Sequence, residues 1–279
     1  FVLVLDGTVQ PDDNLGRIVS LDQLNLPDPE RMCFKYDVTE LATAVKPWLV
    51  ELIFNLGFDQ VVYLDPDIYV TAPLTRVFEL LNHYDVILTP HLDADYPEDA
   101  FIPNESDILR CGQFNLGFLA LRATTNGQNI IKWLRGKLER RCVKEFESGY
   151  FVDQRFFDFV PILFTNIYIL RSPAYNVAYW NLHSRTLAAK DGVWLCNGEA
   201  LVFFHFSGVN TKISPEISRY LTRYNTANRP DIAEILKEYR NAVRVHDDSA
   251  EVGQLPYGFG CFASGSPIPY ETRAYYRHN

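Results

Sequence analysis

The sequence predicts an α/β fold, a single globular unit in which helices cover a largely buried sheet. The run from Val61 to Leu64 is continuously apolar, without the alternation of a surface strand, which is typical of a central parallel strand buried on both faces. Residues 37–56 and 128–146 instead carry apolar side chains at helical spacing. At 279 residues the chain is long, but α/β folds of this length often form one domain around a large core.

Composition excludes two classes of function. The formal net charge of -9 argues against a protein that binds the nucleic-acid backbone, which needs clustered Lys and Arg. No window approaches the roughly eighteen uninterrupted apolar residues of a membrane span, so we expect a soluble protein without a signal peptide in this chain. The five cysteines are scattered and form no C-x-x-C pair, which is typical of reduced thiols and favours a cytoplasmic location.

The N-terminal residues predict a buried strand over positions 1–5, ended by a turn at Asp6-Gly7. A chain rarely begins inside its own core. Either this chain is trimmed or a preceding segment has been removed, and the sequence leaves both open. Residues 8–36 are mixed and rich in turn residues, so we assign them to a connecting region.

Residues 37–56 predict a helix that Asp37 caps and Gly57 ends. Pro47 interrupts it, because proline ends a helix yet suits the first turn of a new one. Lys46 would then lie at a helix N-terminus, a natural place for a phosphate group. The alternative is an ordinary surface lysine.

Asp65 and Asp67 follow the apolar strand directly. In open α/β sheets ligands bind beyond the carboxyl ends of strands, and side chains at i and i+2 of an extended segment project to the same side. With Pro66 fixing the backbone between them, both carboxylates can face one divalent cation. A turn at the strand end is the alternative, since Asp and Pro are common turn residues.

The next segments predict a helix over 73–81, a strand over 85–89 that leads to His91, and a long loop over 91–106. A long loop inside a compact domain is usually functional or mobile.

A further strand is expected over 112–121, with a polar Asn115 embedded in it. Its amide, and the missing side chain of Gly117, would admit a hydroxylated ligand. Asn115 could instead simply satisfy backbone groups.

The predicted helix over 128–146 is amphipathic and basic, and its outward charges are interpreted as a solvated face: Lys132, Arg135, Lys137, Arg140 and Arg141. Residues 149–159 predict another helical run with Asp153 and Gln154 in its first turn. Because an acid there complements the helix dipole, capping is one interpretation of Asp153.

Asn176 and Asn181 stand among aromatic residues, a composition suited to sugar faces and hydroxyl groups but equally to a buried turn. A second apolar strand then runs from Val202 into His205, followed by Ser207, Gly208 and, beyond them, Lys212. A single histidine on an apolar strand is usually a satisfied core residue. Together with the aspartate pair, a metal-ligand role is the better interpretation.

The C-terminal part predicts a helix over 232–243 and then a tail rich in Gly, Pro and Tyr. Arg273 and Arg277, with the tail tyrosines, could close over a bound ligand, and packing as a structural cover is an equal alternative. We divide the chain into a core over residues 1–214 and a C-terminal helix and tail over residues 215–279 that pack on it.

Four motifs in this order resemble those of a GT-A glycosyltransferase of the glycogenin-like family 8 type: Tyr63-Leu-Asp-Pro-Asp67, Phe114-Asn-Leu-Gly-Phe118, Asp153-Gln154 and His205-Phe-Ser-Gly208. The broader pattern is similar to a related group of bacterial glycosyltransferase domains, through Ala44-Val-Lys-Pro47, residues 176–181 and the C-terminal Gly265-x-Pro-Ile segment. The resemblance covers nearly the whole chain. Each motif alone occurs widely by chance, whereas four in family order are far more specific.

The resemblance implies a Rossmann-like mixed sheet with a sugar nucleotide bound over the strand ends, and a first strand that is missing from this chain. It implies that Asp65, Asp67 and His205 hold Mn²⁺ or Mg²⁺ on the diphosphate, and an imidazole ligand favours Mn²⁺. Asp153 and Gln154 are the candidate catalytic residues, Asp153 as nucleophile, base or sugar anchor. Further contacts to the donor are expected from Lys46, Asn115, Gly117, Asn176, Asn181, Ser207, Gly208 and Lys212, the last of which lies seven residues after His205 where the family usually has six.

The expected function is therefore a metal-dependent transfer of a hexose from a nucleoside-diphosphate sugar, with retention of configuration implied by the resemblance. The acceptor is a glycan, a lipid-linked molecule or a protein. Two alternatives stay open. One is a non-catalytic carbohydrate-binding or scaffold domain of degenerate transferase origin, and the other is a nucleotidyltransferase, which would release pyrophosphate.

Overall fold

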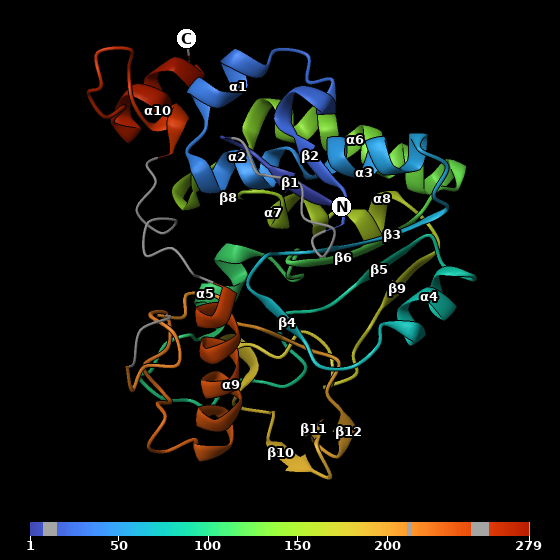
Figure 1. The fold of residues 1–279 in the computed structure, drawn as a ribbon, viewed down its shortest axis with the longest axis vertical. Coiled ribbons are helices and arrows are strands. Elements are labelled where there is room, and N and C mark those ends of the chain that lie inside the picture. The colour runs from blue at the N-terminus through green and yellow to red at the C-terminus, as the bar shows by residue number, and fades with distance from the viewer. Residues whose placement is uncertain (8–15, 211–213, 247–256, 279) are drawn as a thin grey trace.

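A mixed sheet lies at the centre of the computed structural model, which describes residues 1–7, 16–210, 214–246 and 257–278 (Figure 1). The strand order is β3 (Gln60–Leu64), β6 (Phe118–Arg122), β5 (Val86–Leu88) and β9 (Ile167–Ile169). β6 runs antiparallel to both β3 and β5, whereas β5 and β9 are parallel. Helices α3 (Lys46–Asn55) and α6 (Thr125–Arg141) pack on one face and α4 (Thr75–Leu81) on the other. The predicted mixed α/β sheet flanked by helices is thus confirmed.

The place of β3 in this sheet differs from the prediction. We expected a central parallel strand, but among the described strands β3 ends the sheet and pairs antiparallel with β6. The continuous apolar run of β3 is explained by packing on both faces of the strand. Val61 and Tyr63 pack into the cluster under α3 and α6, while Val62 and Leu64 pack into the cluster under α4. Both faces are covered, as predicted, although the strand is neither central nor parallel.

Short strands form the smaller sheets. β1 (Val2–Val4) pairs in parallel with β2 (Ile18–Ser20), and β4 (Ile68–Val70) pairs antiparallel with β13 (Phe203–His205). The others are β7 (Lys144–Glu145) with β8 (Tyr150–Phe151), and the set β10 (Leu187–Lys190), β11 (Val193–Cys196) and β12 (Glu199–Ala200).

The N-terminal strand is present as β1, but the prediction that it is buried was wrong, because Phe1 and Val2 are 41% and 42% exposed and residues 3–5 are only partly buried. The assignment of residues 8–36 to a connecting region was also wrong for its described part. That part contains β2, a 3₁₀ helix over Leu21–Leu24 and α1 (Pro29–Lys35). β2 has only three residues, Ile18, Val19 and Ser20, which are too few to predict a strand from sequence. The strand depends on pairing with β1.

The break expected at Pro47 is present. α2 (Val38–Ala44) opens with a capping box in which Asp37 accepts from the Glu40 backbone at 2.8 Å and Glu40 accepts from the Asp37 backbone at 3.1 Å. α3 begins at Lys46 with proline in its first turn, as proline prefers. The remaining helices are α5 (Glu105–Cys111), α7 (Gln154–Phe157), α8 (Val160–Leu163), α9 (Pro230–His246) and α10 (Tyr270–His278), with 3₁₀ helices over Phe146–Ser148, Tyr179–Asn181 and Gly258–Gly260.

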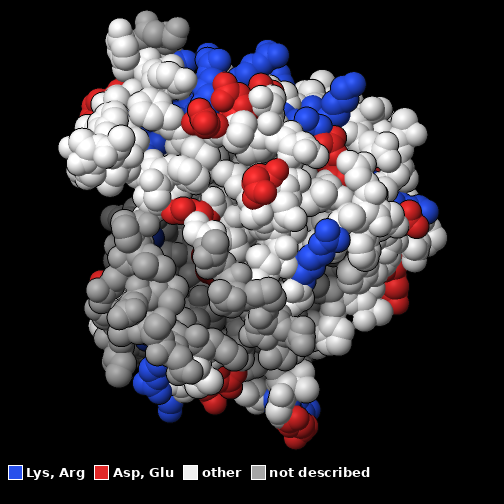
Figure 2. All heavy atoms as spheres, turned by 45° about the horizontal axis from the view of Figure 1, so that its top comes forward, with Lys and Arg blue, Asp and Glu red and all other residues white. Residues whose placement is uncertain are grey.

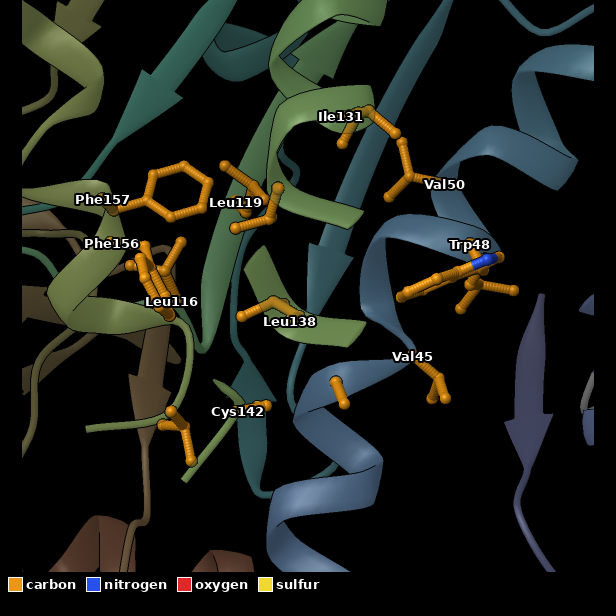
Figure 3. Packing of buried hydrophobic residues seen from close by; sticks show 14 of the residues in the cluster. Val45, Trp48, Val50, Leu116, Leu119, Ile131, Leu138, Cys142, Phe156 and Phe157 are labelled. Carbon is orange, nitrogen blue, oxygen red and sulfur yellow. The ribbon is translucent and has the colours of Figure 1, made fainter. Parts of the chain in front are cut away.

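The largest hydrophobic cluster fills the space between the sheet, α3, α6 and α7 (Figure 3). Trp48 from α3 and Ile131 and Leu138 from α6 are at most 2% exposed, and Leu119 reaches them from β6. Since burying each such side chain contributes about 1.5–3 kcal/mol, this cluster stabilises the sheet that carries Asp65 at its edge.

Two glycines of α6 give a matched test of this packing. A Cβ on Gly127 would lie 2.0 Å from the carbonyl oxygen of Arg122, whereas a Cβ on Gly136 would meet nothing within 4 Å. We expect Gly136→Ala to raise the free energy of unfolding by about 1 kcal/mol through helix propensity. Gly127→Ala should lower it by about 1–3 kcal/mol through overpacking. Urea denaturation measures both, and equal stabilisation by the two substitutions would contradict the packing described for Gly127.

The C-terminal tail anchors to the N-terminal helices. The Arg273 guanidinium is buried and donates to the carbonyl oxygens of Cys33 at 3.1 Å and Tyr36 at 2.7 Å. Arg277 pairs with Glu40 and Glu145, each at 3.2 Å. For these two arginines the structure favours the structural cover over closure upon a ligand. The boundary at residue 214 stays a prediction.

Lys and Arg gather at the end of the molecule that carries α1 and α6, with Asp and Glu among them (Figure 2). Lys132, Lys137, Arg140 and Arg141 are exposed there, in keeping with a solvated outer face of α6. Within the described residues, none of the helices combines the length and apolar character needed to cross a membrane. All five cysteines lie in the described part of the chain, and none of them is in a disulfide.

Candidate active site

A cavity of about 690 Å³ lies beyond the carboxyl end of β3. The β4–β13 ladder places His205 opposite Ile68, and the Phe206 N–H donates to the Asp67 carbonyl at 2.9 Å. This pairing brings the segment after β13 next to the segment after β3, although they are far apart in sequence. Asp65, Asp67 and His205 all line the cavity.

These three side chains form one cluster of potential metal ligands. One ligand atom from each of Asp65, Asp67 and His205 lies within 4.8 Å of the others. The His205 Nε2 is 3.0 Å from Asp67 Oδ1. Burial raises the pKa of Asp67, but the hydrogen bond and charge of His205 outweigh it and hold that pKa below its usual range. The predicted metal triad is thus brought together, while its occupation by a metal stays a prediction.

Lys46 is a buried lysine rather than the surface lysine of the alternative interpretation. Its ammonium lies 3.2 Å from Asp153 and 3.4 Å from Asp65, and donates to the Leu116 carbonyl at 3.0 Å. Burial lowers the pKa of Lys46, but the charges of Asp153 and Asp65 overcome this and raise it well above its ordinary value. The Lys46 charge is therefore shared between two carboxylates before any phosphate is bound.

Asp153 is 2% exposed and faces the same cavity. Its side chain makes no capping hydrogen bond to α7, so the capping interpretation was wrong. Burial raises the pKa of Asp153, against the lowering effect of Lys46. The preceding Val152 has φ of 40°, an unfavourable region for a β-branched residue, so surrounding contacts hold the backbone that orients Asp153.

Asn115 does not present a free amide to a ligand. Its Oδ1 accepts from the Gly117 backbone, from Asn176 and from His205, each at 3.1 Å. Its Nδ2 donates to Gln154 Oε1 at 3.0 Å and lies 3.4 Å from His91 Nε2. Since an amide offers two lone pairs and two hydrogens, Asn115 is already saturated and serves to position its neighbours.

Protein atoms also occupy the space where a side chain of residue 117 would lie. A Cβ there would lie 2.3 Å from His205 Cε1 and 2.9 Å from Asn115 Oδ1. The missing side chain therefore admits the His205 imidazole, where we expected it to admit a ligand.

Asn176 and Asn181 are fully buried and do not line the cavity. Asn181 accepts from the Ala178 backbone at 2.9 Å and donates to the Asn176 carbonyl at 2.9 Å. The buried-turn interpretation thus describes these residues better than contact with a sugar.

Gln154 lines the cavity, but its amide is engaged as well: Oε1 accepts from Asn115 at 3.0 Å and from the Leu116 backbone at 3.3 Å. Ser207 and Gly208, just beyond β13, line the cavity, and their contact with a sugar donor stays a prediction. Lys212 lies outside the described residues.

Sequence reasoning missed the role of His91 and Trp180, which line the cavity beside the triad. The Trp180 ring packs edge-on against His91 and against His205, with centroids 5.2 Å apart in both pairs. A signal for His91 existed, because it lies shortly after the carboxyl end of the buried strand β5, and Asp65 likewise lies at the carboxyl end of β3.

His91 should make stability depend on pH. Burial lowers its pKa from about 6.5 to about 4, so between these values the unfolded chain binds a proton that the folded protein does not. The contribution of His91 to the free energy of unfolding is complete above about pH 6.5 and is lost as the pH falls to about 4. The loss amounts to about 3 kcal/mol, at about 1.4 kcal/mol per pKa unit. We expect the stability difference between wild type and His91→Phe, from urea denaturation at pH 7 and 4, to shrink by that amount. A difference that does not change with pH would contradict this assignment.

No family model matches the chain. Two proteins of Bacillus subtilis (strain 168) are similar in sequence. The uncharacterized protein YfnF is 28% identical over 177 residues, which cover 62% of this chain and 57% of YfnF. The uncharacterized protein YfnD is 25% identical over 189 residues, which cover 66% of this chain and 58% of YfnD. This chain thus spans less than two thirds of the length of either relative.

One solved structure with a similar arrangement is the crystal structure of a glycosyltransferase involved in the glycosylation of the major capsid of PBCV-1. The match covers 72% of this chain and 78% of that chain, with 12% sequence identity and a TM-score of 0.42. Similarity at that level does not bear on the activity of this chain.

Proposed function

We propose that the chain is a metal-dependent glycosyltransferase that moves a hexose from a nucleoside-diphosphate sugar to an acceptor. The observation that carries the proposal is the convergence of Asp65, Asp67 and His205 within 4.8 Å at the wall of a 690 Å³ cavity. A third acid, Asp153, reaches the same cavity from another segment of the chain.

The donor set fits a divalent cation. Two carboxylates and one imidazole suit Mn²⁺ or Mg²⁺, and the imidazole favours Mn²⁺. The contact between His205 Nε2 and Asp67 Oδ1 at 3.0 Å supports this. This contact places a nitrogen and an oxygen ligand atom side by side, with Asp65 next to them at the cavity wall.

A bound divalent cation would act as a Lewis acid on the diphosphate leaving group. Side chains of the protein position the carboxylates of the site. Lys46 holds Asp65 and Asp153 in place and keeps both carboxylates compensated in a buried setting. Tyr63 donates to Asp65 Oδ1 at 2.7 Å and fixes that carboxylate further. Asp153 is then the buried acid available as nucleophile, base or sugar anchor, and transfer with retention belongs to this proposal.

Hydrolysis of a panel of nucleoside-diphosphate sugars tests the proposal. We expect Mn²⁺ to support release of a nucleoside diphosphate and free sugar from at least one donor, and a chelator to stop it. In a parallel assay that offers a nucleoside triphosphate and a sugar phosphate, release of pyrophosphate would instead identify a nucleotidyltransferase. Binding of sugars without turnover of any donor would identify a non-catalytic carbohydrate-binding domain.

A further inference from the structure

We infer that the groove between α1 and α6, here called the basic groove, is a binding site for a ligand that presents two or more phosphate groups. The groove is a cavity of about 950 Å³, larger than the candidate active site. It lies at the end of the molecule where Lys and Arg gather (Figure 2). The inference is independent of the proposed transferase, because no residue of the metal triad lines the groove.

Positive charge dominates the basic groove. Seven Lys or Arg side chains line it against three carboxylates, although the chain as a whole has a formal net charge of -9. Arg277 is compensated by Glu40 and Glu145, each at 3.2 Å. Within the described part of the chain, the other six cations have no carboxylate oxygen within 4.0 Å: Arg31, Lys35, Lys132, Lys137, Arg140 and Arg141. The groove therefore holds a surplus of cations that the protein itself does not pair.

Helical spacing places like charges beside one another along the basic groove. Arg31 and Lys35 are four residues apart on α1, and Lys137 and Arg141 are four residues apart on α6. Side chains at this spacing are neighbours on a helix surface, so each like-charged pair destabilises its helix. Gly136, which also lines the groove, leaves its floor open, because a Cβ there would meet nothing within 4 Å. An anion held between the two helices would relieve both repulsions.

The ionisation of Lys35 reflects this surplus of positive charge. Lys35 is 8% exposed, and its ammonium donates to the backbone carbonyl of Glu139 at 2.5 Å rather than to a carboxylate. Burial, followed by the positive charge of Arg31, lowers the pKa of Lys35 to about 8, against a smaller opposing effect of the Glu139 charge. A phosphate group beside Lys35 would stabilise the charged ammonium.

The side chains of the basic groove suit several phosphate groups. A guanidinium matches two phosphate oxygens at once, and a lysine ammonium binds phosphate as a point charge. Aromatic rings hold two of the cations in place. Lys137 Nζ lies 5.6 Å from the Trp133 ring centroid. The Arg141 guanidinium lies 5.0 Å from the Tyr150 ring centroid and donates to the Tyr150 hydroxyl at 2.7 Å. A ligand with a single charge would leave most of these cations unpaired, so the groove fits a ligand with more than one phosphate.

One hairpin separates the basic groove from the candidate active site. Glu145 pairs with Tyr150 across β7 and β8, and both line the groove. Their neighbours Lys144 and Phe151 pair across the same strands and line the active-site cavity. Because successive side chains of a strand point to opposite faces, this hairpin is a wall between the two cavities. A ligand in the groove lies outside the metal site, so its binding can be measured with divalent cations removed.

Binding of inorganic tripolyphosphate and of lipid vesicles to the whole chain tests the inference, with a chelator present to remove divalent cations. Isothermal titration calorimetry measures the affinity for tripolyphosphate. Vesicle flotation compares phosphatidylcholine vesicles with and without phosphatidylglycerol. The double variant Lys137→Gln with Arg140→Gln removes two exposed cations of the basic groove. The matched control, Lys190→Gln with Lys237→Gln, removes two exposed cations elsewhere on the protein.

We expect wild type and the control to bind at least one of the two probes with equal affinity. The groove variant should bind that probe about 30-fold more weakly, at about 5-fold for each cation removed. Raising the salt from about 0.1 M to about 1 M should weaken the binding, because the Debye length falls from about 10 Å to about 3 Å. Binding of tripolyphosphate alone would identify a soluble ligand, and binding of phosphatidylglycerol vesicles alone would identify lipid headgroups. If wild type binds neither probe, or if the groove variant binds as tightly as the control, the inference is overturned.

Discussion

Replacing Lys46 by methionine is expected to lower the free energy of unfolding by about 3–5 kcal/mol, the usual result of removing one partner from a buried ion pair. Methionine keeps the length of the side chain but leaves Asp153, 2% exposed, and Asp65 without their shared cation. Urea denaturation at neutral pH measures the effect.

Lys132→Met is the matched control, because Lys132 is exposed on α6 and its loss should change stability by less than about 0.5 kcal/mol. The double variant Lys46→Met with Asp153→Asn should recover part of the loss, since it removes one of the stranded charges. If Lys46→Met were no more destabilising than Lys132→Met, the buried pair would not have the role assigned to it.

Asp67→Asn is expected to reduce manganese-dependent hydrolysis of the sugar nucleotide by about 10²–10³-fold, corresponding to several kcal/mol of lost transition-state stabilisation. Asparagine keeps the size and one oxygen of the side chain but removes the charge that faces His205 Nε2 at 3.0 Å. Steady-state turnover at saturating donor, with Mn²⁺ varied, measures the change.

The control for this substitution is Asp59→Asn, which removes an exposed carboxylate just before β3. It should leave turnover unchanged. Equal turnover in Asp67→Asn and wild type would show that the reaction does not depend on this carboxylate.

The positions of Asp65, Asp67 and His205 could be predicted because the two aspartates come after the apolar strand β3 and His205 is the last residue of β13, and the carboxyl ends of strands in such folds meet ligands. The distances between these three side chains could not be predicted. They depend on the β4–β13 pairing, which joins two three-residue strands far apart in sequence. Short strands of this kind have little intrinsic preference and form where the tertiary structure brings them together.

For a related reason, the sequence could not predict that Asn115, Gly117 and Lys46 contact protein groups. A polar residue in an apolar strand signals that hydrogen bonds are needed, but not whether ligand or protein supplies them. Here the protein supplies them: His91, Gln154, Asn176 and His205 saturate the Asn115 amide. The position of β3 was misjudged because a run packed between two clusters looks the same in sequence whether the strand is central or at the end of the sheet.

Binding of Mn²⁺, followed by electron paramagnetic resonance of the free ion, tests most directly that Asp65, Asp67 and His205 form a metal site for a diphosphate. The measurement compares wild type with Asp67→Ala and His205→Ala, each with and without a nucleoside diphosphate. We predict that wild type binds Mn²⁺, that the nucleoside diphosphate tightens this binding, and that both variants lose it. Mn²⁺ binding that is equal in all three proteins, or absent from wild type even with the nucleoside diphosphate, would contradict the metal site and with it the proposed transferase.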